Sequence, residues 1–265
     1  MVPRGDRRGE APLTAEQLEQ LAERAAELSA HSESAGEVLR FAAGLYREQA
    51  AAAALLEETP LSGNLQRDGE RVAESAVPLL GWIASNAPSP LAEEAAARAA
   101  QDPLLPLRAY WSGTAEDDYL SRAVLRPYVQ VLAAAGARPD RARAERMCPF
   151  CSGAPWVGSR RSAADADGAA RFLHCALCGG SWQVMRIICP ACGESDPGKL
   201  PSFQSEKHAG VRIEACETCK AYVKSIDLTL DARRVPEVDE LLSLGMDLWA
   251  AEQGFMRIEP GLAGL

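Results

Sequence analysis

The chain has 265 residues, a formal net charge of −9 and a sequence pI of about 5.0. Hydrophobic residues make up 47% and charged residues 25%, which is typical of a globular protein that buries its own core. The acidic balance argues against general binding to nucleic-acid phosphates. No apolar run reaches the roughly 18 residues that a membrane span requires, so we expect no membrane partner.

Residues 1–145 are predicted to form a helical domain. Thr14 and Gln17 fit a capping box, and apolar residues recur at helical spacing after them. Pro78 is expected to kink the third helix. His31 is assigned to a turn, and this part of the chain contains no catalytic constellation. The expected helices cover residues 15–28, 35–58, 68–85, 91–101 and 117–137.

The start of the chain bears on its localisation. Arg7 and Arg8 resemble part of an export signal, but no apolar segment follows them. We therefore expect a cytoplasmic protein whose first residues form a tail.

All eight cysteines lie between Cys148 and Cys219, where they form four Cys-x-x-Cys pairs. A shift of 41 residues superposes the first pair on the third and the second on the fourth, and 23 residues separate the two pairs of each unit. An exact repeat indicates two copies of one module, which we place at 146–188 and 189–231.

Each module is expected to contain a hairpin between its two pairs. In the first module the strands are PWVGSRR and ARFLH, with ADADGA at the tip; in the second they are KLPSFQ and GVRIEA. Gly179 and Gly193 directly follow a pair and allow the backbone to turn around sulfur. His208 is expected on the surface at the second tip.

The spacing of the cysteines favours metal binding. Two thiolates on one tight turn can bind the same ion, and a second turn completes a tetrahedron. Disulfides need an oxidising compartment, which nothing in the sequence indicates. A thioredoxin-like site uses one pair in a βαβ setting, and four repeated pairs do not match it.

The repeat favours sequential ligand sets, although a crossed pairing of first with third and second with fourth pairs stays open. His174 precedes Cys175 but is not needed as a ligand. Tetrahedral sulfur sites hold zinc or iron, and spacing does not decide between them. The expected sets are Cys148, Cys151, Cys175 and Cys178 for one ion and Cys189, Cys192, Cys216 and Cys219 for the other.

The segment after the modules, 232–265, is predicted to hold one helix over 235–255 and an irregular tail. Pro236 fits its first turn and Gly254 its end. The predicted apolar side consists of Leu241, Leu242, Met246, Leu248 and Trp249. Together these elements predict an α+β protein: a helical bundle, two tandem four-cysteine modules similar to rubredoxin or zinc ribbons, and a C-terminal helix.

Four segments together resemble the formate dehydrogenase accessory protein family, FdhE. They are RMCPFCSGAPWVG, ARFLHCALCGGSWQVMRIICPACGE, IEACETCKAYVKSID and VDELLSLGMDLWAAEQGF, within residues 146–257. The resemblance implies a non-enzymatic cytoplasmic factor, needed for active molybdenum- or tungsten-containing formate dehydrogenase, that binds the catalytic subunit. It also implies that the metal is iron (Fe³⁺), with zinc as the alternative.

Two other functions stay open at this point. The modules resemble rubredoxin and would suit a one-electron carrier. A nucleic-acid-binding zinc ribbon is less favoured, because residues 147–230 carry nine Lys/Arg and eight Asp/Glu, and bound four-thiolate sites would make the region neutral or acidic. No small-molecule substrate is evident.

Overall fold

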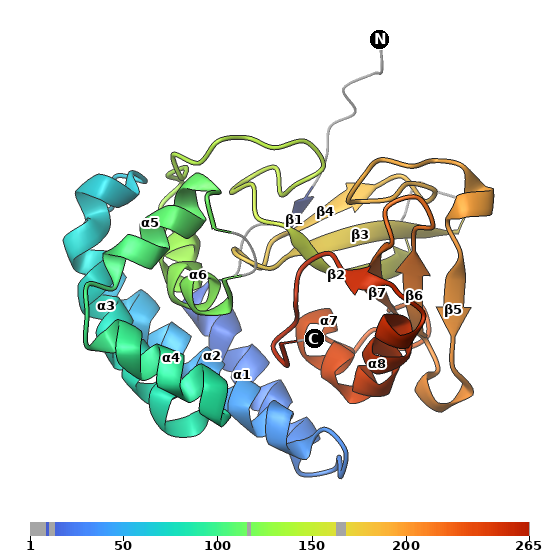
Figure 1. Ribbon diagram of the computed structural model, residues 1–265, viewed down its shortest axis with the longest axis horizontal. Helices are drawn as coiled ribbons and strands as arrows, with labels where there is room; N and C mark the ends of the chain where they lie inside the picture. Colours follow the sequence, from blue (N-terminus) through green and yellow to red (C-terminus); the bar gives the residue numbers. More distant parts are fainter. Residues whose placement is uncertain (1–8, 11–13, 116–117, 163–167, 265) are drawn as a thin grey trace.

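The N-terminal half of the chain is helical, and a mixed sheet with short C-terminal helices follows it (Figure 1). The computed structural model describes residues 9–10, 14–115, 118–162 and 168–264. Within these residues, the helical region, the sheet, the tandem four-cysteine clusters and the C-terminal helices confirm the predicted α+β class. Arg7, Arg8 and residues 164–167 of the first predicted hairpin tip lie outside the described residues.

The helices of the first half follow local signals in the sequence. Thr14 and Gln17 form the predicted capping box, in which each side chain accepts from the other residue's backbone N–H, at 3.3 and 2.8 Å. The described helices are α1 Ala15–Ser29, α2 Gly36–Glu57, α3 Leu65–Asn86, α4 Ser89–Ala99, α5 Leu104–Ser112 and α6 Tyr119–Ala134.

One of these helices was not predicted. Helix α5 has nine residues and contains Pro106, so it is too short to show several turns of apolar periodicity. Asp118 caps α6 by accepting from the N–H of Ser121 at 2.9 Å. His31 follows α1 in the predicted turn, where its Nδ1 lies 2.9 Å from the Glu27 carbonyl.

The two modules each contribute three antiparallel strands to one sheet. The strand order is β1-β4-β3-β2-β7-β6-β5, and β8 pairs with β7 outside this path. The modules meet where β2 pairs in parallel with β7, with Val157 opposite Lys224. The strands are β1 Gly9–Glu10, β2 Pro155–Ser162, β3 Ala169–Cys175, β4 Ser181–Val184, β5 Ser202–Gln204, β6 Val211–Ala215, β7 Ala221–Asp227 and β8 Met256–Arg257. Two 3-10 turns, η1 Pro197–Lys199 and η2 Glu206–His208, flank β5, so His208 lies half-buried between β5 and β6.

The C-terminal segment differs from the prediction in three ways. The expected single helix is α7 Pro236–Asp239, a 3-10 turn η3 Glu240–Ser243, and α8 Leu244–Glu252. Leu248 was wrongly assigned to the apolar side, since it is 54% exposed. The tail predicted as irregular contains strand β8, because the backbone N–H groups of Met256 and Ile258 donate to carbonyls beside and within β7.

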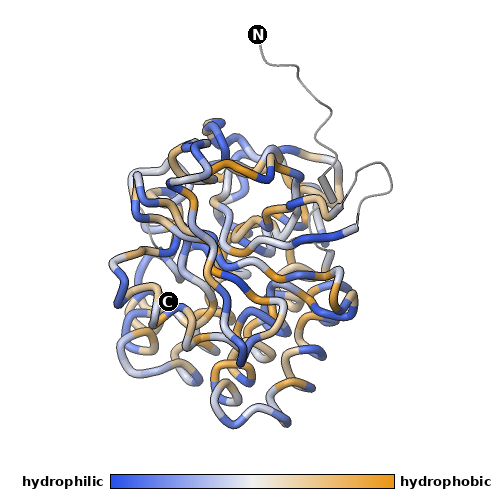
Figure 2. The backbone as a smooth tube through the Cα atoms, turned by 90° about the vertical axis from the view of Figure 1, so that its right-hand side faces the viewer, coloured by the Kyte–Doolittle hydropathy of each residue, from blue (hydrophilic) through white to orange (hydrophobic). Residues whose placement is uncertain are grey.

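One hydrophobic core joins the helices to the sheet, and it includes residues of both modules. In Figure 2, hydrophobic residues recur along the helices between hydrophilic ones instead of forming continuous runs. Accordingly, none of the described helices combines the length and apolar character that spanning a membrane requires.

Candidate metal centres

The four Cys-x-x-Cys pairs adopt the same backbone turn. The N–H of the residue after the second cysteine donates to the carbonyl of the first cysteine, over 2.8–3.1 Å in all four pairs. That residue always has a positive φ, and two of the four, Gly179 and Gly193, are the predicted glycines. The other two are Ser152 and Lys220, with φ of 58° and 59°. The repeated spacing thus encodes a repeated turn.

These turns bring the eight cysteines together in the sequential sets, and not in the crossed ones. In each set, all sulfur atoms lie within 4.8 Å of one another. In the first centre, Sγ of Cys148 lies 3.6 Å from Sγ of Cys178, and that of Cys151 lies 3.5 Å from that of Cys175.

The second centre has the same arrangement. Sγ of Cys189 lies 3.7 Å from Sγ of Cys219, and Sγ of Cys192 lies 3.7 Å from Sγ of Cys216. All eight cysteines are free thiols. A disulfide would need about 2.0 Å between sulfurs.

The sulfur geometry fits a tetrahedral metal ion. A regular tetrahedron with metal–sulfur bonds of about 2.3 Å has sulfur–sulfur edges of about 3.8 Å. The closest pairs, at 3.5–3.7 Å, approach this value. Either centre could therefore hold one metal ion, and an all-sulfur donor set suits zinc or iron.

Backbone N–H groups also point at the sulfurs. Sγ of Cys175 accepts from the N–H groups of Leu177 and Cys178, both at 3.4 Å. Sγ of Cys216 likewise accepts from the N–H groups of Thr218 and Cys219. Such donors stabilise negative charge on sulfur, as metal ligation requires.

The two centres differ in burial. In the first centre all four cysteines are buried, and Cys175 and Cys178 are fully inaccessible. In the second, Cys192 is exposed and Cys219 is half-buried. The first set belongs to the continuous hydrophobic core, whereas the second lies outside it.

Burial controls the protonation of the first centre. It raises the pKa of the Cys151 and Cys175 thiols. Hydrogen bonds from the other three thiols, first that of Cys151, hold the pKa of Cys148 far below its usual range. Four buried sulfurs therefore cannot all ionise together without a cation between them.

The second centre shows a milder version of the same effect. Burial raises the pKa of the Cys219 thiol to about 12. In Cys216, burial acts in the same direction, but hydrogen bonds from the N–H groups of Cys219 and Thr218 outweigh it and lower the pKa. This centre is closer to the state that binds a metal.

His174 does not join the first centre, as expected, but it anchors the module from which Cys175 comes. Its Nε2 lies 2.9 Å from Oγ of Ser159, and its Nδ1 lies 2.8 Å from Oε1 of Glu237 in α7. All three side chains are buried. Burial raises the pKa of Glu237, but the charge of His174 reverses this, and the net shift is downward.

Arg126 of α6 contacts the first centre from the helical side. Its Nη1 donates to the carbonyl of Ala176, between Cys175 and Cys178, over 3.4 Å. The side chain is 3% exposed and stacks near the rings of Tyr46 and Trp156. Nε and Nη2 of Arg126 have no hydrogen-bond partner among the described residues. A buried cation thus lies against the turn that holds two of the four sulfurs.

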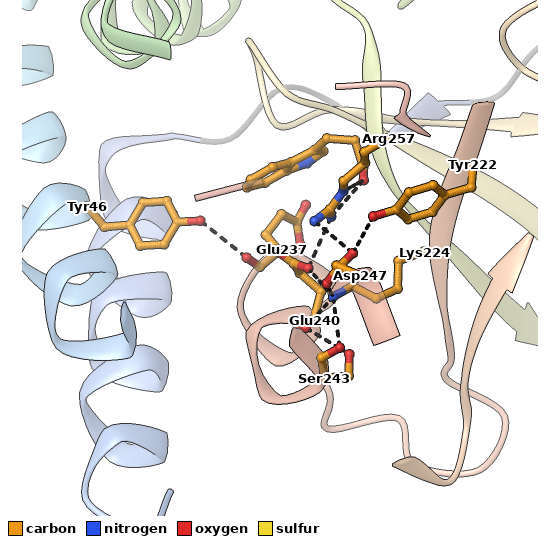
Figure 3. Close-up of polar contacts among 9 residues, drawn as sticks. Tyr46, Tyr222, Lys224, Glu237, Glu240, Ser243, Asp247 and Arg257 are labelled. Atoms are coloured by element: carbon orange, nitrogen blue, oxygen red, sulfur yellow. Dashed lines mark hydrogen bonds and ion pairs between the residues drawn. The ribbon is translucent and has the colours of Figure 1, made fainter. Parts of the chain in front are cut away.

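A buried ionic cluster, which sequence reasoning missed, fixes the C-terminal helices to the sheet (Figure 3). Nζ of Lys224 lies 2.8 Å from Oε2 of Glu240 and also pairs with Asp247. Arg257 pairs with the same two carboxylates, at 3.1 and 3.5 Å. The Tyr222 hydroxyl donates to Oδ1 of Asp247 over 2.9 Å.

Two cations and two carboxylates balance the charge of this cluster. Burial raises the pKa of Glu240, but the charges of Arg257 and Lys224 bring it below its usual range. The only signal in the sequence is the isolated Lys224 within an otherwise apolar strand, and it does not reveal its partners. Figure 3 also shows Tyr46 of α2, whose hydroxyl donates to the Glu237 carbonyl over 3.5 Å.

Comparison with known proteins gives the cysteine region a family. Residues 147–186 match the family model described as FdhE, central domain, and residues 187–262 match the one described as FdhE, C-terminal domain. A protein FdhE homolog of Aquifex aeolicus is 36% identical over 120 residues, which are 45% of this chain and 42% of the relative.

Two further relatives give similar values. A protein FdhE homolog of Pseudomonas aeruginosa is 34% identical over 123 residues, 44% of this chain and 38% of the relative. Protein FdhE of Escherichia coli is 33% identical over 125 residues, 45% of this chain and 39% of the relative. These matches span about two fifths of the length of the relatives.

The fold is shared over a longer range. The crystal structure of the FdhE protein from Pseudomonas aeruginosa superposes with a TM-score of 0.69 at 22% identity, covering 96% of this chain and 98% of that one. At this identity the likeness concerns the fold alone, and it includes the helical region. Through residues 147–262, with their two four-cysteine centres, this chain belongs to the FdhE family.

Proposed function

We propose that this protein is a non-enzymatic accessory factor for the maturation of a molybdenum- or tungsten-dependent formate dehydrogenase, and that it binds the catalytic subunit in the cytoplasm. The observation that carries the proposal is the pair of four-cysteine centres within the region that matches both FdhE domain models. Two rigid modules in a single sheet offer a large, preformed surface for a protein partner.

The eight cysteines are proposed as ligands of two ions, one in each centre. Iron is favoured by the family resemblance, and zinc is the alternative. Sulfur spacing and N–H donors support ligation by thiolates. When bound, a metal ion would crosslink the two turns of a module, and ferric iron would add a one-electron couple.

The test of the maturation role is genetic. The gene is deleted, and formate oxidation is measured in extracts of the deletion strain and of strains complemented with the wild-type gene or with a variant in which the four cysteines of one centre are replaced by serine. We expect loss of formate oxidation on deletion and recovery with the wild-type gene only. Full activity in the deletion strain would overturn the proposal.

Binding to the partner needs a separate measurement. The purified protein is mixed with the catalytic subunit made without its cofactor and with the mature enzyme, and complex formation is followed by size-exclusion chromatography. We expect a complex with the cofactor-free subunit. Absence of a complex, together with normal loss of activity on deletion, would place the protein elsewhere in the maturation route.

A one-electron carrier is the second candidate, and the exposure of Cys192 and Cys219 supports it. A sulfur ligand at the surface brings the ion close to a redox partner. This function predicts a red protein with a reversible ferric/ferrous couple. A colourless preparation that contains only zinc excludes it.

A further inference from the structure

A cavity of about 190 Å³ lies between the two modules, beside the second centre. Its walls include Arg160 of β2, Arg171 of β3 and Glu214 of β6, together with Cys189 and Cys216. Ser159 faces α7 through its contact with His174. Because side chains alternate along a strand, Arg160 points to the opposite face of the sheet.

The charges that line this cavity do not balance. Glu214 accepts from Arg171 Nε over 2.7 Å and from Arg160 Nη2 over 3.3 Å, so one carboxylate serves two guanidinium groups. Arg186 also lines the cavity. Three arginines and one glutamate leave a charge of +2, and a ferric four-thiolate centre beside them, at −1, would reduce it to +1.

Two observations show that the arginines are prepared for a further acceptor. Nε of Arg160 is buried and has no hydrogen-bond partner among the described residues. Arg171 is 3% exposed and held in place, because its Nη1 also donates to the carbonyls of Ile188, at 2.8 Å, and Met185, at 3.4 Å. A buried N–H group without an acceptor is costly, so a ligand that supplies one gains affinity.

The repeat confirms that this arrangement is not a by-product of module architecture. The equivalent of Arg171 in the second module is Arg212, which pairs one-to-one with Asp227 at 3.4 Å. The equivalent of Glu214 in the first module is Leu173. Only at the junction of the modules do two arginines share one carboxylate beside a cavity.

We propose that this cavity binds a carboxylate group, held by Arg160 and Arg171. Its volume corresponds to about six water molecules, at about 30 Å³ each, which admits a small organic acid or one Asp or Glu side chain but not a nucleotide. Guanidinium groups bind carboxylates through paired N–H donors. The site is independent of the proposed role in maturation.

The test uses the full-length protein loaded with zinc, a diamagnetic ion, and follows the arginine Nε–H resonances by NMR. The protein is titrated with sodium acetate, and separately with a blocked Gly-Ser-Glu-Ser-Gly peptide, against sodium chloride at matched ionic strength. We expect saturable shifts at Arg160. Saturation by acetate assigns the site to a free small acid, and saturation by the peptide alone assigns it to a side chain of a protein.

Variants distinguish the cavity from general charge effects. Arg160→Gln is expected to weaken binding about tenfold, the effect of losing one charge-assisted hydrogen bond. Arg233→Gln removes the same charge from a side chain that is 88% exposed and outside the cavity, and should bind as wild type does. Zinc content and circular dichroism report on folding of each variant.

Arg160→Lys provides the answer if Arg160→Gln does not fold. It keeps the charge but lacks the buried Nε–H, so binding should still weaken several-fold. Two results overturn the proposal: no saturation by either probe beyond the chloride reference, or equal affinity in the Arg160 variants and in Arg233→Gln.

Discussion

The two four-cysteine centres share their spacing and backbone turns, yet they occupy different environments. The first lies within the core that joins the helices to the sheet, and the second lies outside that core with Cys192 exposed. Identical ligand geometry can therefore coexist with different access to solvent. The difference teaches that cysteine spacing sets how the sulfurs meet, while the packing of distant segments decides what can reach them.

Packing around the first centre is tight and specific. Arg126 contacts the turn of the second pair, and Gly153 leaves no room for a side chain against the sulfurs. At the second centre the equivalent of Gly153 is Glu194, whose side chain points away to hydrogen-bond with Thr218. We expect the first centre to support the fold and the second to be the more readily exchanged.

The largest expected contrast comes from removing one sulfur from each centre. Cys175→Ser should destabilise the protein by at least about 4 kcal/mol, because it opens a metal site inside the core. Cys192→Ser should cost much less and leave a folded protein with one ion. Metal analysis and thermal unfolding by circular dichroism measure both effects, and equal losses of stability would contradict the comparison.

A matched pair of substitutions tests the close packing. In Gly153→Ala, the new Cβ would lie 2.7 Å from Sγ of Cys175 and 2.9 Å from Cβ of Leu177. We expect a loss of about 1–3 kcal/mol and weaker metal retention in the first centre. The equivalent change, Glu194→Ala, removes only exposed hydrogen bonds, including the one with Thr218.

Chemical denaturation and competition with a chelator measure both members of this pair. Retained stability in Gly153→Ala would mean that the turn can move away from the sulfurs. The contrast between the two centres would then be smaller than their geometry indicates.

The charge of Arg126 provides a third test. Arg126→Met removes the buried cation at the Ala176 carbonyl, so we expect the first centre to release its metal to a chelator at an about tenfold lower concentration. Arg138→Met is the control. Nη1 of Arg138 lies 3.5 Å from the Pro149 carbonyl of the same centre, but the side chain is exposed and water screens its charge.

The second centre should be unaffected by either substitution. A similar shift in Arg126→Met and Arg138→Met would show that burial does not strengthen the interaction. The first centre would then owe its retention to packing alone.

The smallest expected effect concerns the two turns without glycine. Ser152 and Lys220 adopt positive φ, so glycine at either position relieves about 1 kcal/mol of strain. Ser152→Gly should stabilise the protein by about that amount. Lys220→Gly should gain less, because it also loses the ion pair with Glu217 and the contact with the Phe255 ring.

Urea unfolding curves measure this difference between the two turns. A loss of stability in Ser152→Gly would indicate that its side chain makes a contact that outweighs the strain. Both variants should keep two bound ions.

The repeat made the cysteine clusters predictable, because a shift of 41 residues aligns all four pairs and each pair specifies a local turn. Exposure of Cys192 was not predictable in this way, since it depends on which segments pack over each module. The buried partners of Lys224 were also missed. Charged residues usually lie at the surface, and Arg257 is 33 positions away in a tail that lacked any pattern.

The junction of β2 with β7 was likewise beyond sequence reasoning. Hairpins follow from neighbouring segments, but parallel pairing of strands about 67 residues apart leaves no local signal. The short helix α5 was missed for the same reason, in that nine residues carry too little periodicity.

The way the modules join has a consequence for their history. The first strand of one module meets the last strand of the other, so the contact is head-to-tail and has no two-fold axis. Duplication by such a contact does not terminate itself, and β5 presents the same kind of border that β2 offers to β7. Among the described strands none adjoins that border, which is only three residues long. Its brevity limits the addition of a third copy, or of strands from neighbouring molecules in a crowded cell.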